Sequence, residues 1–139
     1  MRRFVLDASV TLAWFVDPVV APVAVRVRQF LFRGDRAIVP HLWRSEIANG
    51  FLIAQKRGIL AGVRVLEAFS ELDRFMGQSV DNFDRDFPIR QIVAAAQNFG
   101  LTAYDATYLE TARELQVPLA TLDRTLVTAA AQAGVTVIS

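Results

Sequence analysis

Near its start the chain reads Phe4-Val5-Leu6-Asp7-Ala8-Ser9, an apolar strand-like run that ends on an acid and leads toward a helix. A short continuous apolar run of this kind is typical of a strand buried in a parallel sheet. Proteins built on open parallel sheets form their sites beyond the carboxyl ends of strands, which is where Asp7 stands.

Similar apolar runs recur along the chain and alternate with segments of helical spacing. They predict further strands at 37–39, 78–80, 118–122 and 135–138. Spacings of three and four residues predict helices at 9–15, 23–32, 42–56, 61–76, 89–99, 104–115 and 124–132. Ser9 is the expected cap of the first helix, and Gly100 is expected to close the helix 89–99. The alternation indicates an α/β fold with a parallel sheet covered on both faces.

The length and composition limit the class of protein. The chain has 139 residues, enough for a single domain, 1–139, and no apolar stretch approaches the ~20 residues of a membrane span. Met1-Arg2-Arg3 leads straight into a strand that ends on a charge, so we expect no secretory leader and a cytoplasmic protein. The absence of cysteine excludes disulfides, thiolate catalysis and thiolate zinc sites.

The charged and apolar residues carry a weaker signal about partners. The formal net charge of +1 indicates little by itself. Every lysine or arginine position except Lys56 holds arginine, which suits bidentate contact with phosphate, and genomic base composition explains the preference equally well. Hydrophobic residues make up 53% of the chain, so we expect an exposed apolar patch of the kind that marks a protein interface.

Four acids stand between apolar neighbours at predicted junctions. They are Asp7, Glu46 in Trp43-Arg44-Ser45-Glu46-Ile47-Ala48-Asn49, Asp105 in Leu101-Thr102-Ala103-Tyr104-Asp105-Ala106, and Asp123 in Leu119-Ala120-Thr121-Leu122-Asp123-Arg124. Such acids are costly to bury unless a positive charge lies among them, and a divalent cation is the simplest candidate. Mg²⁺ and Mn²⁺ prefer carboxylate and water ligands. An acid-rich site of this kind fits metal-dependent phosphodiester hydrolysis.

Helix capping is an alternative explanation for three of these acids. Asp105 fits a capping box with Thr102, and Asp123 and Asp7 can each cap a helix that follows a strand. Glu46 is different, because it lies inside a helix whose apolar residues nearly encircle it. Taken together, the positions favour a shared site.

In this order the acidic segments resemble the motifs of the PIN-domain family, and within it the VapC-type toxins of bacterial toxin–antitoxin pairs. The resemblance rests on Leu6-Asp7-Ala8-Ser9, on Pro40 with Ser45-Glu46 and Asn49, on Leu101-Thr102-Ala103-Tyr104-Asp105-Ala106 with Tyr108-Leu109, and on Ala120-Thr121-Leu122-Asp123. It covers essentially the whole chain. It implies a three-layer α/β/α sandwich around a parallel sheet, and an endoribonuclease toxin of a type II pair that leaves 5′-phosphate and 3′-hydroxyl ends.

The resemblance also implies roles for individual residues and for partners. The residues that would bind Mg²⁺ or Mn²⁺ and carry out catalysis are Asp7, Glu46, Asp105 and Asp123. Ser9 and Thr121 would orient carboxylates through their hydroxyls. A small antitoxin would cover the apolar helices 42–56 and 61–76 and block the site, and a homodimer is usual for the family.

Several other residues are weaker candidates. Arg44, Arg113 and Arg124 lie near the acids in sequence and are candidates for contact with RNA phosphates, although solvated helix faces explain them equally well. His41, the only histidine, is better explained as a residue at a helix start than as a catalytic base. The segment 82–90 alternates acidic and basic residues, and its role stays open.

Three other classes of protein share parts of this pattern. A phosphatase of the haloacid-dehalogenase type needs a second aspartate where Ser9 stands, and a response-regulator receiver needs a lysine after a late strand, whereas the only lysine, Lys56, lies in a predicted helix. A catalytically silent PIN-fold module that acts through an antitoxin and operator DNA remains the alternative. The intact acidic set argues against it.

Overall fold

The sheet at the centre of the fold is parallel, with β1 inside it. The computed structural model describes all residues, 1–139. The strands are β1 (Arg3–Leu6), β2 (Arg36–Val39), β3 (Val80–Asn82) and β4 (Leu119–Ala120), in the order β3-β2-β1-β4 with every pair parallel. The apolar residues of β1 and β2 are buried, as continuous apolar runs predict for such strands.

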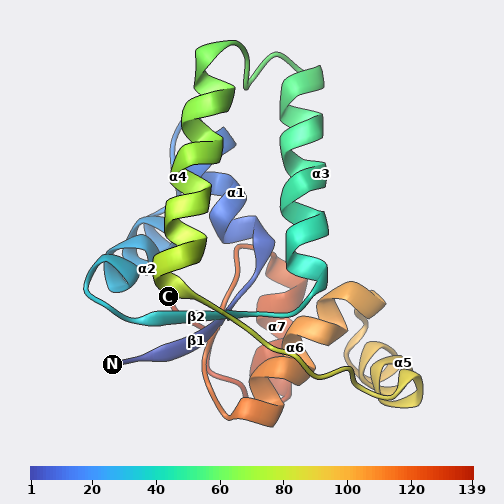
Figure 1. Ribbon diagram of the computed structural model, residues 1–139. Helices are drawn as coiled ribbons and strands as arrows, with labels where there is room; N and C mark the ends of the chain where they lie inside the picture. Colours follow the sequence, from blue (N-terminus) through green and yellow to red (C-terminus); the bar gives the residue numbers. More distant parts are fainter.

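Helices flank this sheet on two sides (Figure 1). On one side lie α1 (Ala8–Val16), α2 (Pro22–Phe32), α3 (Leu42–Lys56) and α4 (Val63–Ser79). On the other side lie α5 (Ile89–Phe99), α6 (Ala103–Leu115) and α7 (Arg124–Gln132). No helix has the length and apolar character that crossing a bilayer requires. The predicted α/β fold, with a parallel sheet between helices, is confirmed.

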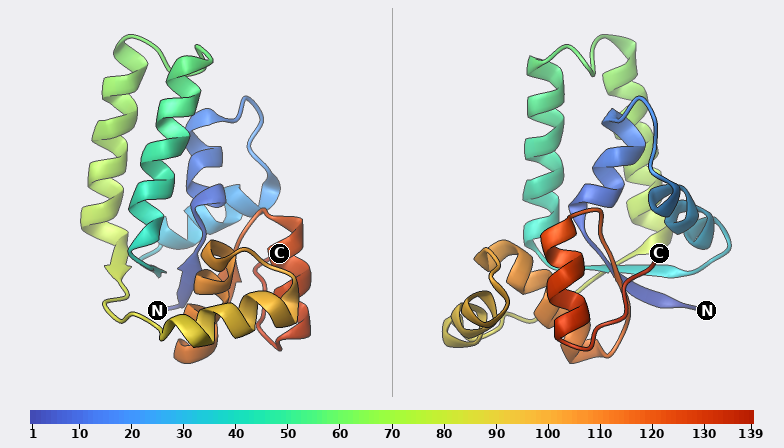
Figure 2. Two further views of the ribbon diagram at one scale, coloured as in Figure 1. Left: turned by 90° about the vertical axis from the view of Figure 1, so that its right-hand side faces the viewer. Right: turned by 180° about the vertical axis from the view of Figure 1, so that it is seen from behind.

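Helices α3 and α4 run side by side in opposite directions and project from the sheet as an arm (Figures 1 and 2). Aromatic rings join this arm to α1. The ring centroids of Phe51 and Phe69 lie 5.3 Å apart, and those of Phe15 and Phe51 lie 5.6 Å apart. Trp14 packs edge-on against Phe75 at 5.2 Å. The rings therefore form the core between these three helices.

Most predicted elements are present, and α3, α5 and α7 have the predicted bounds. Three strands differ from prediction, and one of them, expected at 118–122, is confined to Leu119–Ala120. Gln78 and Ser79 complete α4, so the third strand begins only at Val80. The predicted strand 135–138 is wrong as a strand, because only an isolated parallel bridge joins Val137 to Leu119. Its neighbour β4 is itself two residues long and offers no longer ladder.

The pairing of β1 with β4 brings two chain segments together at the carboxyl ends of both strands. Leu6 is in register with Ala120, so the next residues, Asp7 and Thr121, leave the sheet side by side. Helix α1 begins at once after Asp7, which occupies its N-cap position without a side-chain cap bond. Ser9 lies within the helix, so its expected capping role is wrong.

Candidate functional site

Asp7 is the most deeply buried acid of the candidate site. Its side chain is held at the junction of β1 and α1, and the residue is 5% exposed. The carboxylate Oδ2 accepts hydrogen bonds from Ser9 Oγ at 2.6 Å and from Thr121 Oγ1 at 2.7 Å. Both residues proposed to orient carboxylates therefore contact the same oxygen of Asp7.

The same two hydroxyls also fix the turn that follows β4. The backbone amide of Leu122 donates to Ser9 Oγ at 3.0 Å, and the amide of Asp123 donates to Thr121 Oγ1 at 3.0 Å. Because each hydroxyl accepts from an amide, its own proton is directed to Asp7. The network thus ties the position of Asp123 to that of Asp7.

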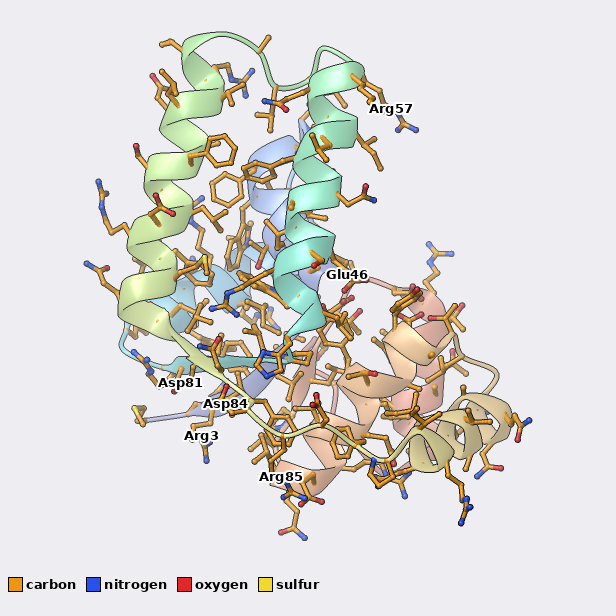
Figure 3. All side chains as sticks on the ribbon, turned by 45° about the vertical axis from the view of Figure 1, so that its right-hand side comes forward. Arg3, Glu46, Arg57, Asp81, Asp84 and Arg85 are labelled. Atoms are coloured by element: carbon orange, nitrogen blue, oxygen red, sulfur yellow. The ribbon has the colours of Figure 1, made fainter.

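Glu46 reaches the site from α3. Figure 3 shows it near the sheet end of this helix, on the side that faces α6 and α7, and far along the helix from Arg57. The residue is half-buried. Its Oε1 accepts a hydrogen bond of 2.5 Å from the hydroxyl of Tyr108, whose ring is fully buried on α6. The motif that includes Tyr108 was noted in the sequence, but no role was predicted for this residue.

Asp105 and Asp123 lie at the N-terminal ends of two helices. The amide of Asp105 donates to Thr102 Oγ1 at 3.1 Å, which confirms Thr102 as the cap of α6. Asp123 caps α7, where its Oδ1 accepts from the amides of Thr125 at 2.8 Å and Leu126 at 3.2 Å. A position at a helix cap is therefore compatible with membership of the acidic cluster. Asp105 joins its cap through the backbone amide, and Asp123 uses only Oδ1.

The pKa values of three acids show that all four share one electrostatic environment. Burial raises the pKa of Asp7, and the negative charge of Asp123 raises it further, while hydrogen bonds from Ser9 and Thr121 partly offset these effects. Burial also raises the pKa of Glu46, with added repulsion from Asp7 and Asp105. The pKa of Asp105 is raised by burial and by the charges of Asp123 and Asp7. The four acids predicted from the sequence are thus brought together.

The chemistry of this cluster suits a divalent cation. Its donors are carboxylate oxygens, the ligands that Mg²⁺ and Mn²⁺ prefer, and a cation would relieve the repulsion among them. As placed, however, no three acidic or histidine side chains are arranged to hold one ion jointly. Hydrogen bonds hold one oxygen each of Asp7, Glu46 and Asp123. The donors fit such a cation chemically, and the second oxygen of each of these three carboxylates is not held by those bonds.

The candidate arginines lie at different distances along the chain from these acids. Arg44 and Arg124 are exposed. Arg44 lies on α3 with Glu46, and Arg124 follows Asp123 directly. Arg113 lies in the last turn of α6, whereas Asp105 lies in the first. Its guanidinium Nη1 is 2.9 Å from Glu110 Oε2, so this arginine is already paired.

Two other candidate features lie apart from the acidic cluster. His41 stands at the start of α3, where its Nε2 is 3.8 Å from Asp84 Oδ1, so it pairs with none of the four acids. The segment 82–90 joins β3 to α5. Within it the rings of Phe83 and Phe87 stack with centroids 5.6 Å apart, which gives part of the segment a packing role.

Known sequences match this chain along nearly its whole length. Residues 4–132 match the PIN domain family. The VapC ribonuclease Mb0985 of Mycobacterium bovis is 35% identical over 138 residues, which cover 96% of this chain and 97% of that protein. Ribonuclease VapC9 of Mycobacterium tuberculosis has the same identity and coverage.

Solved structures share the fold. PAE2754 from Pyrobaculum aerophilum has a TM-score of 0.67 and 24% identity, with 92% of this chain and 84% of that chain covered. FitAcB from Neisseria gonorrhoeae has a TM-score of 0.62 and 21% identity, with 98% and 96% covered. At these identities the likeness establishes the fold alone.

Proposed function

The chain belongs to the PIN-domain family, and from this premise we propose that it is a metal-dependent endoribonuclease, the toxin of a type II toxin–antitoxin pair. The observation that carries the proposal is the convergence of acids from separate elements: Thr121 bonds both to Asp7 and to the amide of Asp123, Tyr108 of α6 bonds to Glu46, and burial with neighbouring acidic charges raises the pKa of Asp7, Glu46 and Asp105. The name ribonuclease borne by relatives of 35% identity supports RNA as the substrate class. We place the activity in a single cytoplasmic domain, 1–139, that forms a homodimer.

In the proposed reaction the protein's own residues hold and orient the reacting groups. The proposed ligands for Mg²⁺ or Mn²⁺, and the catalytic set, are Asp7, Glu46, Asp105 and Asp123. When bound, such a cation acidifies a water molecule and neutralises charge on the phosphate. Ser9 and Thr121 keep Asp7 in one orientation through their bonds to Oδ2. Hydrolysis adds water across a phosphodiester bond and leaves a 5′-phosphate and a 3′-hydroxyl.

Arginines near the cluster are the proposed contacts for RNA phosphates. Arg44 and Arg124 are exposed and adjoin elements that carry the acids, which supports this role for both. Arg113 is a weaker candidate, because its pairing with Glu110 has to be given up before it can bind phosphate. Replacing a phosphate contact weakens RNA binding at all sequences and reduces its salt dependence.

The experiment that tests the proposed activity is cleavage of total cellular RNA by the purified, partner-free protein. Reactions contain Mg²⁺ or Mn²⁺, or excess EDTA, and run in parallel with Asp7→Asn. We expect discrete products that need the metal and disappear in the variant. If a folded Asp7→Asn or Asp105→Asn variant cleaves RNA at the wild-type rate, the assignment of these residues as the catalytic set is wrong.

The arm of α3 and α4 is the proposed docking site of the antitoxin. Its exposed apolar residues support a protein partner, since patches of this kind are costly to leave in water. They are Leu52, Ile53, Ile59, Val63, Leu66 and Phe69. Hydrogen exchange of α3 and α4 should slow when the antitoxin that co-purifies from the native host is bound, and unchanged exchange there would contradict this interface.

The second candidate function is a catalytically silent binding module that acts through an antitoxin and operator DNA. One observation favours it, namely that no three acidic side chains are arranged to hold an ion jointly. The two candidates differ in a simple respect. A silent module neither binds Mn²⁺ with the acidic cluster nor cleaves RNA, whereas the proposed enzyme does both.

A further inference from the structure

Tyr108 makes the closest contact between α6 and the acid on α3. Its hydroxyl donates to Glu46 Oε1 over 2.5 Å, a length typical of a strong bond from a hydroxyl to an ionised carboxylate. The ring is fully buried, so the position of the hydroxyl is fixed by the packing of α6. Burial and the neighbouring carboxylates raise the pKa of Tyr108, which keeps the phenol protonated and able to donate.

The location of this contact relates it to the cluster. Tyr108 lies three residues after Asp105, a spacing that places both on one face of α6. A single helix thus supplies one acid directly and holds a second acid on a different helix. No other side chain donates to Glu46, so without the phenol its carboxylate is free to change rotamer.

The same arrangement recurs at two other acids. Asp7 has Oδ2 held by two hydroxyls, and Asp123 has Oδ1 held by two amides of α7. In each case the fold holds one oxygen, and no side chain donates to the other. Glu46 follows this pattern only because Tyr108 is present, since α3 offers no free amide at a position within the helix.

We propose that Tyr108 is a positioning residue for the cation site, which holds Glu46 by Oε1 and leaves Oε2 available as a ligand. The inference rests on the proposed function, because it concerns how the chain holds the ion that this function requires. Hydrogen-bond partners of metal-binding carboxylates typically contribute about 10–100-fold in affinity. A phenylalanine at this position keeps the packing of the ring and removes only the donor.

The first test compares Tyr108→Phe with Tyr104→Phe, its matched control on the same helix, whose residue is 65% exposed. Mn²⁺ affinity is measured by calorimetry, and RNA cleavage is measured across a range of Mn²⁺ concentrations. We expect Tyr108→Phe to bind Mn²⁺ at least about tenfold more weakly, and its cleavage to recover as Mn²⁺ is raised. Tyr104→Phe should bind like the wild type. A purely structural role lowers the melting temperature of Tyr108→Phe without changing Mn²⁺ affinity, and that result overturns the inference.

A second test needs no change at Tyr108 and covers the case in which that variant does not fold. The chain has 2 tyrosines, so 3-fluorotyrosine gives two fluorine resonances that single substitutions assign. We expect Mg²⁺ to shift the resonance of Tyr108 in the wild type and to leave it unshifted in Glu46→Gln. If Mg²⁺ binds, as judged by a rise in melting temperature, and the Tyr108 resonance does not move, the inference fails alone. If the wild type binds neither ion, the proposed function fails and the inference falls with it.

Discussion

Asp7 is unfavourable for the stability of the fold, although the proposed function requires it. It is 5% exposed, and its neighbours include another acid, so the fold places a carboxyl group where a charge is penalised. Ser9 and Thr121 offset part of this penalty with hydrogen bonds. A residue kept at such an energetic cost is typical of a functional site.

We predict that Asp7→Asn makes the metal-free protein more stable while abolishing RNA cleavage. Asparagine has nearly the same shape, its carbonyl oxygen can accept from both hydroxyls, and it carries no charge. Each pKa unit by which folding raises a carboxyl corresponds to about 1.4 kcal/mol at neutral pH. Thermal unfolding in EDTA measures the change.

The matched control for this prediction is Asp81→Asn. Hydrogen bonding to Arg36 lowers the pKa of Asp81, and the two side chains are 2.7 Å apart, so its charge is stabilising. Its removal should lower stability slightly, by up to about 1 kcal/mol for a partly exposed pair. If Asp7→Asn lowers the melting temperature in EDTA as Asp81→Asn does, the conclusion that the buried carboxyl group of Asp7 destabilises the fold is wrong.

The raised pKa values of Asp7, Glu46 and Asp105 also predict how stability depends on pH without metal. In the window between the ordinary and the raised pKa values, the folded state binds more protons than the unfolded chain. Stability therefore increases as pH falls through the raised pKa values toward the ordinary carboxyl values, and decreases as pH rises through the raised values. Urea unfolding at a series of pH values in EDTA measures this, and saturating Mg²⁺ should remove the gain. A stability that falls steadily on acidification in EDTA would contradict the prediction.

Among the helices and strands, those that could be predicted from the sequence are the ones marked by a local residue pattern. The helices 42–56, 89–99 and 124–132 were predicted with the right bounds, whereas the helix expected at 61–76 spans Val63–Ser79. The acids that stand at strand ends and helix starts were also found from local pattern. The strand 135–138 could not be judged from its composition, because its pairing depends on how short β4 is. Tyr108 was missed as a functional residue for a similar reason, since its contact with Glu46 joins helices far apart in the chain. Its position three residues after Asp105 was the available signal.

The contact between α1 and α3 gives a prediction at this scale. A Cβ added at Gly50 would lie 2.4 Å from Cδ2 and 2.6 Å from Cδ1 of Leu12, so an alanine here fits only if the half-buried Leu12 side chain moves. We predict that Gly50→Ala destabilises the protein, by about 1–3 kcal/mol of overpacking less the gain in helix propensity.

Gly77 provides the control for Gly50 because it lies inside α4 with nothing within 4 Å of an added Cβ. Gly77→Ala should stabilise the protein by about 0.5–1 kcal/mol, since alanine favours the helix. Thermal unfolding of both variants separates packing from propensity. Equal shifts of the same sign would show that the close approach of α1 and α3 does not matter for stability.

For the whole molecule, the arm of α3 and α4 projects from the sheet (Figure 1) and carries exposed apolar residues. Leu66 on this arm is 70% exposed, and Ile89, at the start of α5, is 83% exposed. We predict that Leu66→Asp leaves the stability of the free protein within about 0.5 kcal/mol but weakens neutralisation by the antitoxin. Ile89→Asp is the control and should remain neutralised. Co-expression and growth measure this, and equal neutralisation of both variants would place the antitoxin elsewhere.

In the proposed enzyme, acids from the junction of β1 with α1, from α3, from α6 and from the start of α7 together hold a divalent cation. The most direct measurement is anomalous diffraction from crystals of the protein grown or soaked with Mn²⁺. We expect a peak among Asp7, Glu46, Asp105 and Asp123, with their side chains turned toward it. Crystals in which Mn²⁺ binds elsewhere, or leaves these carboxylates apart at saturating concentration, would contradict it.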